Sequence, residues 1–307
     1  MGHHHGHDHH HHHGATLSNI GKVFVIGIIL NMAFVMIEFV AGFYTNSLAL
    51  LSDAGHNLSD VATLGLSLFA FRMSKRKATS TYTYGFHKST ILASLANAVI
   101  LLIAVGSIGW EAIQRFLEPV ETQGKVISIV AGIGIIINTV SALLFFRDKE
   151  KDLNVKGAYL HLALDALVSA GVVGAGFLIS YTGLKWIDPL ISLLIMAIVI
   201  YSTWGLLTES LKLSLDAVPT AIQIEKIKEE VLKTKGVISV HHIHIWAMGT
   251  TKNAMTAHLI LEKELRPEKV AEIKYTVKHT LEHLNIQHVT LETEIEQCRE
   301  EACTSQE

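Results

Sequence analysis

Charged residues and cysteines are both scarce in this chain of 307 residues. Charged residues make up 17% and hydrophobic residues 50% of the total, which is too apolar a balance for one ordinary soluble domain. The two cysteines, Cys298 and Cys303, lie at the extreme C-terminus, so a disulfide framework does not hold the fold. The formal net charge is only −3 and no basic array is interleaved with aromatic residues, so we expect no nucleic-acid partner. The composition instead predicts a membrane protein.

Histidine is abundant where other ionisable residues are scarce. Nine of the 19 histidines lie in the opening MGHHHGHDHHHHHG, which does not have the basic stretch, short apolar core and cleavage site of a secretory signal. An expression tag is usually one unbroken run, whereas Gly6 and Asp8 interrupt this one, which favours a native metal-collecting tail over a tag. We assign residues 1–19 to a histidine-rich cytoplasmic tail.

Six apolar stretches follow, and each is long enough to cross about 30 Å of hydrocarbon as a helix of roughly 20 residues. They cover residues 20–42, 47–71, 90–113, 126–146, 155–181 and 189–207. The loops after the second and fourth stretches, counted with Lys156 at the start of the fifth stretch, contain nine Lys and Arg residues, against three in the loops after the first, third and fifth. Because positive residues mark cytoplasmic loops, we expect a multi-pass protein of the cell membrane with both termini in the cytoplasm. This α-helical membrane domain covers residues 20–208.

From about Glu209 charged residues become frequent, and no later window is apolar enough to span a bilayer. Residues 221–234 have the periodicity of an amphipathic helix, and Pro267 opens a second helix that runs to about residue 284. Alternation over 237–248, 254–262 and 288–295 indicates strands, with 249–253 as a hairpin loop. The order α-β-β-α-β predicts that residues 209–307 form a small cytoplasmic α+β domain.

Two of the apolar stretches carry ionisable residues at the same spacing. His56 and Asp60 are four apart in the second stretch, and His161 and Asp165 are four apart in the fifth, so each pair lies on one helix face. A charged carboxylate at mid-bilayer costs on the order of 2.5–3.5 kcal/mol, which a bound cation would offset. Two nitrogen and two oxygen ligands suit tetrahedral Zn²⁺ better than Mg²⁺ or Ca²⁺. A polar network between packed helices is the alternative, but the repeated spacing favours a metal site.

Other polar residues in the apolar stretches support weaker expectations. Asp53 lies one turn before His56, and we expect it either to accept a hydrogen bond near the site or to line the pathway. Glu38 and Asn97 are expected to be packing or vestibule residues.

These residues stand within ordered motifs that cover nearly the whole chain. The motifs are SLALLSDAGHNLSD, YGFHKSTILASLANA, WEAIQRFLEP, KDLNVKGAYLHLALDALVS and IDPLISLLI in the membrane part, and GVISVHHIHIWAMG and TAHLILE in the soluble part. With them the chain resembles the cation diffusion facilitators, in particular the bacterial zinc-efflux branch. The resemblance implies a homodimeric divalent-metal/proton antiporter with six transmembrane helices and a cytoplasmic ferredoxin-like domain. It also implies that His56, Asp60, His161 and Asp165 form the transport site, and His56 is typical of the zinc-preferring members.

The resemblance extends to the cytoplasmic histidines. It implies that His241, His258 and Glu294 bind regulatory zinc, with His288 and Cys298 as further candidates. Strand alternation separates His241 from His242 and His244, which we expect to be solvated or structural residues. His279 and His283 are four apart on a charged helix, and we expect them on an exposed surface. The loop at 79–86 has neither Asp nor His, so we expect no metal there.

The sequence therefore predicts a protein that exports Zn²⁺ in exchange for protons and is not an enzyme. An intramembrane metallohydrolase is disfavoured because neither His–Asp motif contains the additional carboxylate that H-E-x-x-H enzymes use as a general base. Two alternatives stay open. One is the same antiport with a broader range that includes Cd²⁺, Co²⁺, Ni²⁺ or Fe²⁺, and the other is a membrane-anchored metal sensor that does not transport.

Overall fold

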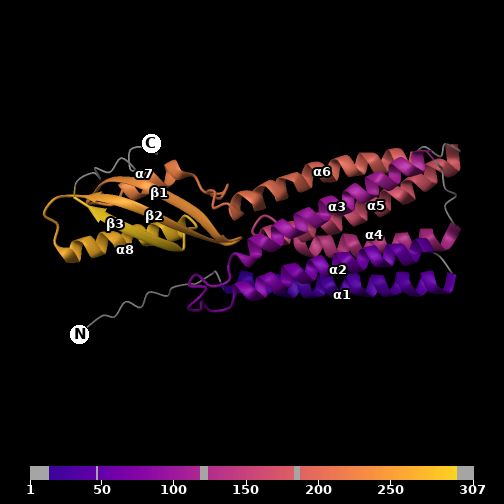
Figure 1. Ribbon diagram of the computed structural model, residues 1–307, viewed down its shortest axis with the longest axis horizontal. Coiled ribbons are helices and arrows are strands. Elements are labelled where there is room, and N and C mark those ends of the chain that lie inside the picture. Colours follow the sequence, from indigo (N-terminus) through magenta and orange to yellow (C-terminus); the bar gives the residue numbers. More distant parts are fainter. Residues whose placement is uncertain (1–13, 46–47, 118–123, 183–186, 296–307) are drawn as a thin grey trace, which may run out of the picture. The chain divides into compact units, whose positions relative to one another are not determined.

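The computed structural model describes residues 14–45, 48–117, 124–182 and 187–295. These residues fall into two compact units, drawn in Figure 1. The helical unit combines Met1–Arg72, Ile103–Glu150 and Val155–Ile200, and the mixed unit combines Met73–Leu102, Lys151–Asn154 and Tyr201–Glu307. The N-terminal histidine tract at 1–13 and Cys298 lie outside the described residues.

Five of the six apolar stretches lie within one long helix each, and the second does so from residue 48, since residue 47 is outside the described part of the chain. The helices are α1 (Gly14–Thr45), α2 (Leu48–Ser74), α3 (Ser89–Leu117), α4 (Gly124–Phe146), α5 (Leu153–Thr182) and α6 (Ile187–Ser214). The α1 helix begins at Gly14, so the last residues assigned to the tail are helical. Among the described residues, the helical segments Gly21–Tyr44 and Ser89–Ser107 are long and apolar enough to cross a membrane.

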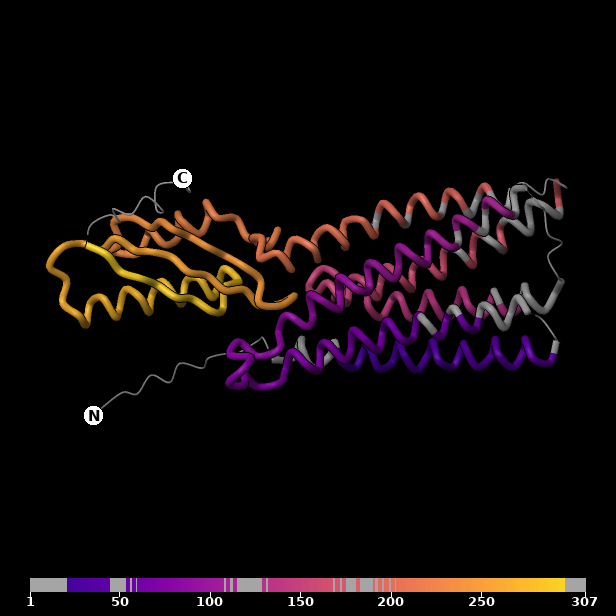
Figure 2. The backbone as a smooth tube through the Cα atoms, in the orientation of Figure 1, coloured from indigo at the N-terminus to yellow at the C-terminus, as the bar shows by residue number. Residues whose placement is uncertain are grey.

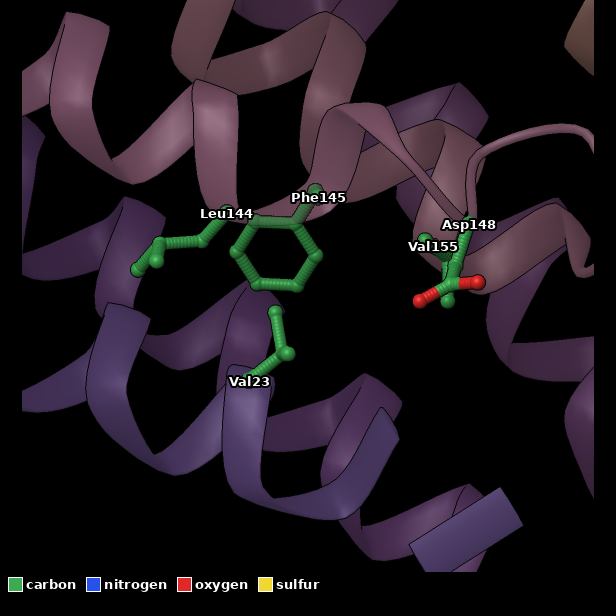
Figure 3. Close-up of a pocket in the computed structure, with 5 residues that line it drawn as sticks. All are labelled: Val23, Leu144, Phe145, Asp148 and Val155. Carbon is green, nitrogen blue, oxygen red and sulfur yellow. The ribbon is translucent and has the colours of Figure 1, made fainter. Parts of the chain in front are cut away.

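Aromatic side chains fill the core of the helical unit. The rings of Phe24 in α1 and Phe145 in α4 meet edge to face, with centroids 5.1 Å apart, and Leu64 and Leu162 are buried beside them. A Cβ at Gly27 would stand only 3.0 Å from the Phe145 ring, so this glycine allows α1 and α4 to approach closely. Figure 3 shows a small pocket that is lined by four apolar residues of this core, Val23, Leu144, Phe145 and Val155, and by Asp148.

The mixed unit contains the predicted α-β-β-α-β order. Its elements are α7 (Ile224–Leu232), β1 (Val237–Gly249), β2 (Lys252–Leu261), α8 (Pro267–His283) and β3 (His288–Glu294). The sheet order is β1-β2-β3, with β1 and β2 antiparallel and β2 and β3 parallel. Both helices pack on one face of this sheet, where Val231, Val277, Leu281 and Leu259 are fully buried. On the opposite face, β2 presents Thr256 and His258 together with Ala254 and Ile260.

The β1–β2 hairpin is tighter than the predicted five-residue loop, because Gly249 already pairs with Lys252. Its tip contacts the starts of α3 and α5 (Figure 2). The Thr250 amide donates to Thr90 Oγ1 at 3.0 Å, and the Thr250 hydroxyl donates to Asp152 Oδ2. Asp152 also caps α5, since its Oδ1 accepts the Asn154 amide at 2.8 Å. The hairpin tip therefore contacts Asp152, the residue that caps the N-terminus of α5.

Candidate metal centres

The helical unit brings three of the four predicted transport ligands together. His161 Nε2 lies 2.7 Å from Asp60 Oδ1 and 3.9 Å from Asp165 Oδ2. One ligand atom from each of these residues fits within 4.8 Å of the others, which is a spacing that could hold a metal ion. Asp60 and His161 are 3% and 5% exposed, so the group is shielded from solvent. The His161–Asp60 contact also joins α5 to α2.

Helix periodicity accounts for this arrangement. Residues four apart lie one above the other on a helix, so His161 and Asp165 share the face of α5 that meets α2. Leu162, next to His161, turns toward the apolar core of the helical unit instead. His56 lies on α2 one turn before Asp60, but its side chain is outside the described part of the structure, and so is that of Asp53.

A second polar contact adjoins this group on α2. Asn57 Nδ2 donates a hydrogen bond of 2.8 Å to Glu38 Oε2, and Glu38 is completely buried in α1. Glu38 was expected to be a packing or vestibule residue, and the structure places its carboxylate against the residue that follows His56. The sequence gives no signal for this pairing, because it depends on how α1 and α2 face each other.

The mixed unit contains a second group, made by His241, His258 and Glu294. His258 Nδ1 lies 2.6 Å from Glu294 Oε1, and His241 Nε2 lies 3.4 Å from Glu294 Oε2. His258 Nε2 also lies 3.5 Å from Glu292 Oε2. His241 and His258 pair directly across β1 and β2, which is why their side chains share one face of the sheet.

The donor atoms of this group fit a metal ion. Among the described residues, neither ring nitrogen of His241 has a hydrogen-bond partner, and Glu294 Oε2 has none either, although all three atoms are buried. Buried polar atoms normally find partners, so their exceptions need an explanation. Imidazole nitrogens with a carboxylate oxygen are ligands that Zn²⁺ accepts, and an ion here would satisfy one ring nitrogen of His241 together with a carboxylate oxygen of Glu294.

The prediction that strand alternation places His241 and His244 on opposite faces of the sheet is wrong. His241 pairs with His258 and His244 pairs with Thr256, so β1 uses one residue more than β2 over this interval. The extra residue is a β-bulge, which reverses the alternation beyond it and brings His244 to the same face as His241. We call this face, with His241, His244, His258 and Glu294, the histidine face.

His288 does not join the cluster. It pairs with Ala254, whereas His258 pairs with Glu292 four residues further along β3, so His288 lies toward the opposite end of the sheet. Its ring instead meets Tyr84 edge to face, with centroids 5.2 Å apart. On α8, His279 and His283 are exposed as expected, and the centroids of their rings lie 4.7 Å apart.

Comparisons with known proteins agree along nearly the whole chain. The model of the cation efflux transmembrane domain matches residues 24–213, and that of the cytoplasmic domain of cation efflux proteins matches residues 219–296. The zinc transporter ZitB of Pectobacterium atrosepticum is 35% identical, over 94% of this chain and 90% of its own. The cadmium, cobalt and zinc/H(+)-K(+) antiporter of Bacillus subtilis is 34% identical, over 90% and 89%. The metal cation efflux system protein CzcD of Cupriavidus metallidurans is 36% identical, over 90% and 87%.

Proposed function

The protein belongs to the cation efflux family, with a transmembrane domain followed by a cytoplasmic domain, and we propose that it exports Zn²⁺ from the cytoplasm in exchange for protons. The observation that carries the proposal is the shielded group of Asp60, His161 and Asp165 between two helices of the membrane domain. In this proposal His56 supplies the fourth ligand. Relatives named as zinc transporters and as a zinc/H(+)-K(+) antiporter support the same substrate.

The chemistry of these ligands couples zinc to protons. A histidine binds metal only when its nitrogen is unprotonated, and an aspartate binds it as the carboxylate, so protons and zinc compete for one set of atoms. Imidazole ordinarily titrates near neutral pH, which makes it an effective exchange group. Zinc loads from the cytoplasm, the helices rearrange, and protons from outside displace the ion.

The membrane voltage sets the number of protons that the cycle needs. Moving Zn²⁺ outward against an inside-negative potential costs about 4.6 kcal/mol per 100 mV, and each returning proton recovers about 2.3 kcal/mol. With one proton the cycle works against the voltage and draws on the pH gradient. With two protons it is electroneutral.

The proposal includes the number of membrane-spanning helices, the side of the membrane on which the termini lie, and the domain boundaries. Helices α1 to α6 cross the membrane with both termini in the cytoplasm, residues 1–19 form the tail, and residues 209–307 form the ferredoxin-like domain. Support comes from the six long helices and from the two helices packed on one face of a three-stranded sheet. The α6 helix continues to Ser214, beyond the proposed boundary of the membrane domain at residue 208.

We also propose that zinc at His241, His258 and Glu294 regulates transport in a homodimer. A buried ring nitrogen of His241 that has no hydrogen-bond partner in the described part of the chain supports a bound ion there. His288 is left out of this site because of its position on β3.

Zinc flux into proteoliposomes with an imposed pH gradient tests the transport proposal. Asp165→Ala removes a ligand oxygen, and we expect it to reduce Zn²⁺ flux to the level of empty liposomes. Leu167→Ala, at a surface position on the same helix, is the matched control and should transport like the parent. Flux by Asp165→Ala equal to that of the parent would contradict the assignment. Loss of flux with intact zinc binding in the cytoplasmic domain would exclude a sensor that does not transport.

A broader metal range is the second candidate, because the Bacillus subtilis relative is named for cadmium and cobalt as well as zinc. Nitrogen and oxygen ligands also accept Co²⁺, Ni²⁺ and Cd²⁺. Competition between Zn²⁺ and each of these ions in the same flux assay separates the two candidates.

A further inference from the structure

His242 has an unusual backbone conformation for a residue inside a strand. Among the described residues, four that are not glycine have positive φ angles, and they are Asp216, His242, Glu264 and Asn285. Of these, His242 alone lies within a strand, with φ of 51°. Such conformations are strained for residues other than glycine and cluster at functional sites. The bulge at His242 therefore points to a role for its side chain.

Because of the bulge, the His242 ring lies on the histidine face, in a row with the other imidazole rings. The His242 ring lies 4.7 Å from the ring of His244 and 4.9 Å from that of His258, measured between centroids. The His258 ring in turn lies 5.4 Å from that of His241. Regular alternation would instead have placed His242 on the face that packs against α7 and α8.

These spacings suit shared metal ligation. With Zn–N bonds of about 2.0–2.1 Å and tetrahedral angles, two imidazoles on one zinc have ring centres about 5 Å apart. The 4.7 Å between His242 and His244 is near this value, but so is the spacing of His279 and His283 on α8, so the spacing permits shared ligation and the buried His242 nitrogen distinguishes the pair. His242 Nδ1 is also buried without a hydrogen-bond partner among the described residues, so it has a lone pair or a proton that no protein group satisfies.

We propose that His242 and His244 form a second divalent-metal position on the histidine face, beside the cluster of His241, His258 and Glu294. Two neutral imidazoles with water at the remaining positions suit borderline cations such as Zn²⁺, Cu²⁺ and Ni²⁺. This position has no carboxylate of its own, so it binds the ion more weakly than the neighbouring cluster. It goes beyond the transport function and stands whether or not the protein moves zinc across the membrane.

The exposure of the imidazoles distinguishes the two positions. His244 is exposed and His242 is half-buried, whereas the side chains of His241 and Glu294 are only 11% and 16% exposed. A zinc ion from the cytoplasm therefore reaches His244 first. The second position is therefore the more accessible of the two, and the cluster of His241, His258 and Glu294 is the less exposed one.

Zinc titration of the full-length protein by equilibrium dialysis tests this proposal. The background carries Asp60→Asn and Asp165→Asn, and serine replaces the nine N-terminal histidines, so that bound zinc reports the cytoplasmic domain. We expect this background to bind zinc in a stronger and a weaker step. His242→Asn with His244→Asn should remove the weaker step alone, and Glu294→Gln should remove the stronger step alone. Asparagine is suitable at 242 because it tolerates positive φ.

The exposed pair on α8 provides the matched control. His279→Asn with His283→Asn removes two imidazoles whose rings are also 4.7 Å apart, and both steps should persist. The single variant His244→Asn leaves the bulge untouched and should also remove the weaker step, which guards against misfolding at 242. Retention of both steps in the His242 and His244 variants would overturn the proposal. Loss of both steps together in Glu294→Gln would overturn it as well, because the histidines would then form one site.

Discussion

Single residues near the group of Asp60, His161 and Asp165 show how the membrane domain tolerates buried polar groups. Asn57 and Glu38 are 6% and 0% exposed, and their hydrogen bond joins α2 to α1 one residue after His56. A buried carboxylate that accepts a hydrogen bond is far less costly than one that does not. This contact therefore joins α1 to the turn of α2 that precedes Asp60.

We expect Asn57→Ala to destabilise the protein by about 1–3 kcal/mol, because it removes a hydrogen bond to a buried charged group. Thermal unfolding in detergent should show a lower midpoint than the parent. Leu58→Ala is the control, since Leu58 is 49% exposed on the same helix. Equal midpoints for Asn57→Ala and the parent would show that this bond does not hold α1 against α2.

A prediction for metal selectivity rests on His56. Replacing it with aspartate exchanges a borderline nitrogen ligand for an oxygen, so His56→Asp should raise Cd²⁺ transport relative to Zn²⁺. Flux of the two ions measured in the same proteoliposomes gives the ratio. An unchanged ratio would remove His56 from any role in selectivity.

At the level of elements, the β1–β2 hairpin tip packs tightly on the start of α3. A Cβ at Gly249 would stand 2.8 Å from the His87 carbonyl oxygen, so only glycine fits there without movement. Burial first, and the nearby Lys252 charge second, lower the pKa of His87 below its ordinary value. The packing of the hairpin tip against the start of α3 therefore favours the neutral form of His87.

The sign of this pKa shift predicts how the hairpin responds to pH. The unfolded imidazole titrates near pH 6.5, so the contribution of His87 is complete above about pH 6.5 and is lost as the pH falls toward the lower folded value. After correction for intrinsic rates, amide hydrogen exchange at the hairpin tip should be faster at about pH 5.5 than at about pH 7.5. His87→Gln should abolish the difference, and a persistent difference in this variant would assign the effect to another group.

Across the whole molecule, α3 and α6 each supply residues to both units. The positive residues of the loops after the second and fourth apolar stretches predict which ends of these helices face the cytoplasm. The same rule predicts that the C-terminal domain lies on that side of the membrane.

Cysteine labelling checks this topology. In a background with Cys298→Ser and Cys303→Ser, an impermeant maleimide added to intact cells should label Tyr181→Cys and leave Ala78→Cys unlabelled. Both positions are exposed in the structure, so both should react after the cells are broken. Labelling of Ala78→Cys in intact cells would reverse the proposed orientation.

Local pattern alone determined much of this protein. Six apolar stretches predicted the six long helices, and the His–Asp spacing of four predicted that His161 and Asp165 share one helix face, because side-chain direction in a helix follows from sequence separation. The order of helices and strands in the mixed unit was also read correctly, since alternation and helical periodicity are local properties.

The tertiary structure decided which of these residues meet. Asp60 lies against His161 only because α2 packs beside α5. Strand alternation failed at His242, where pairing with β2 leaves one residue of β1 in a bulge and turns His244 to the face of His241. Parallel pairing with β2 likewise set Glu294 beside His258 and moved His288 away. Register and bulges depend on the partner strand, so a pattern read along one strand does not contain them.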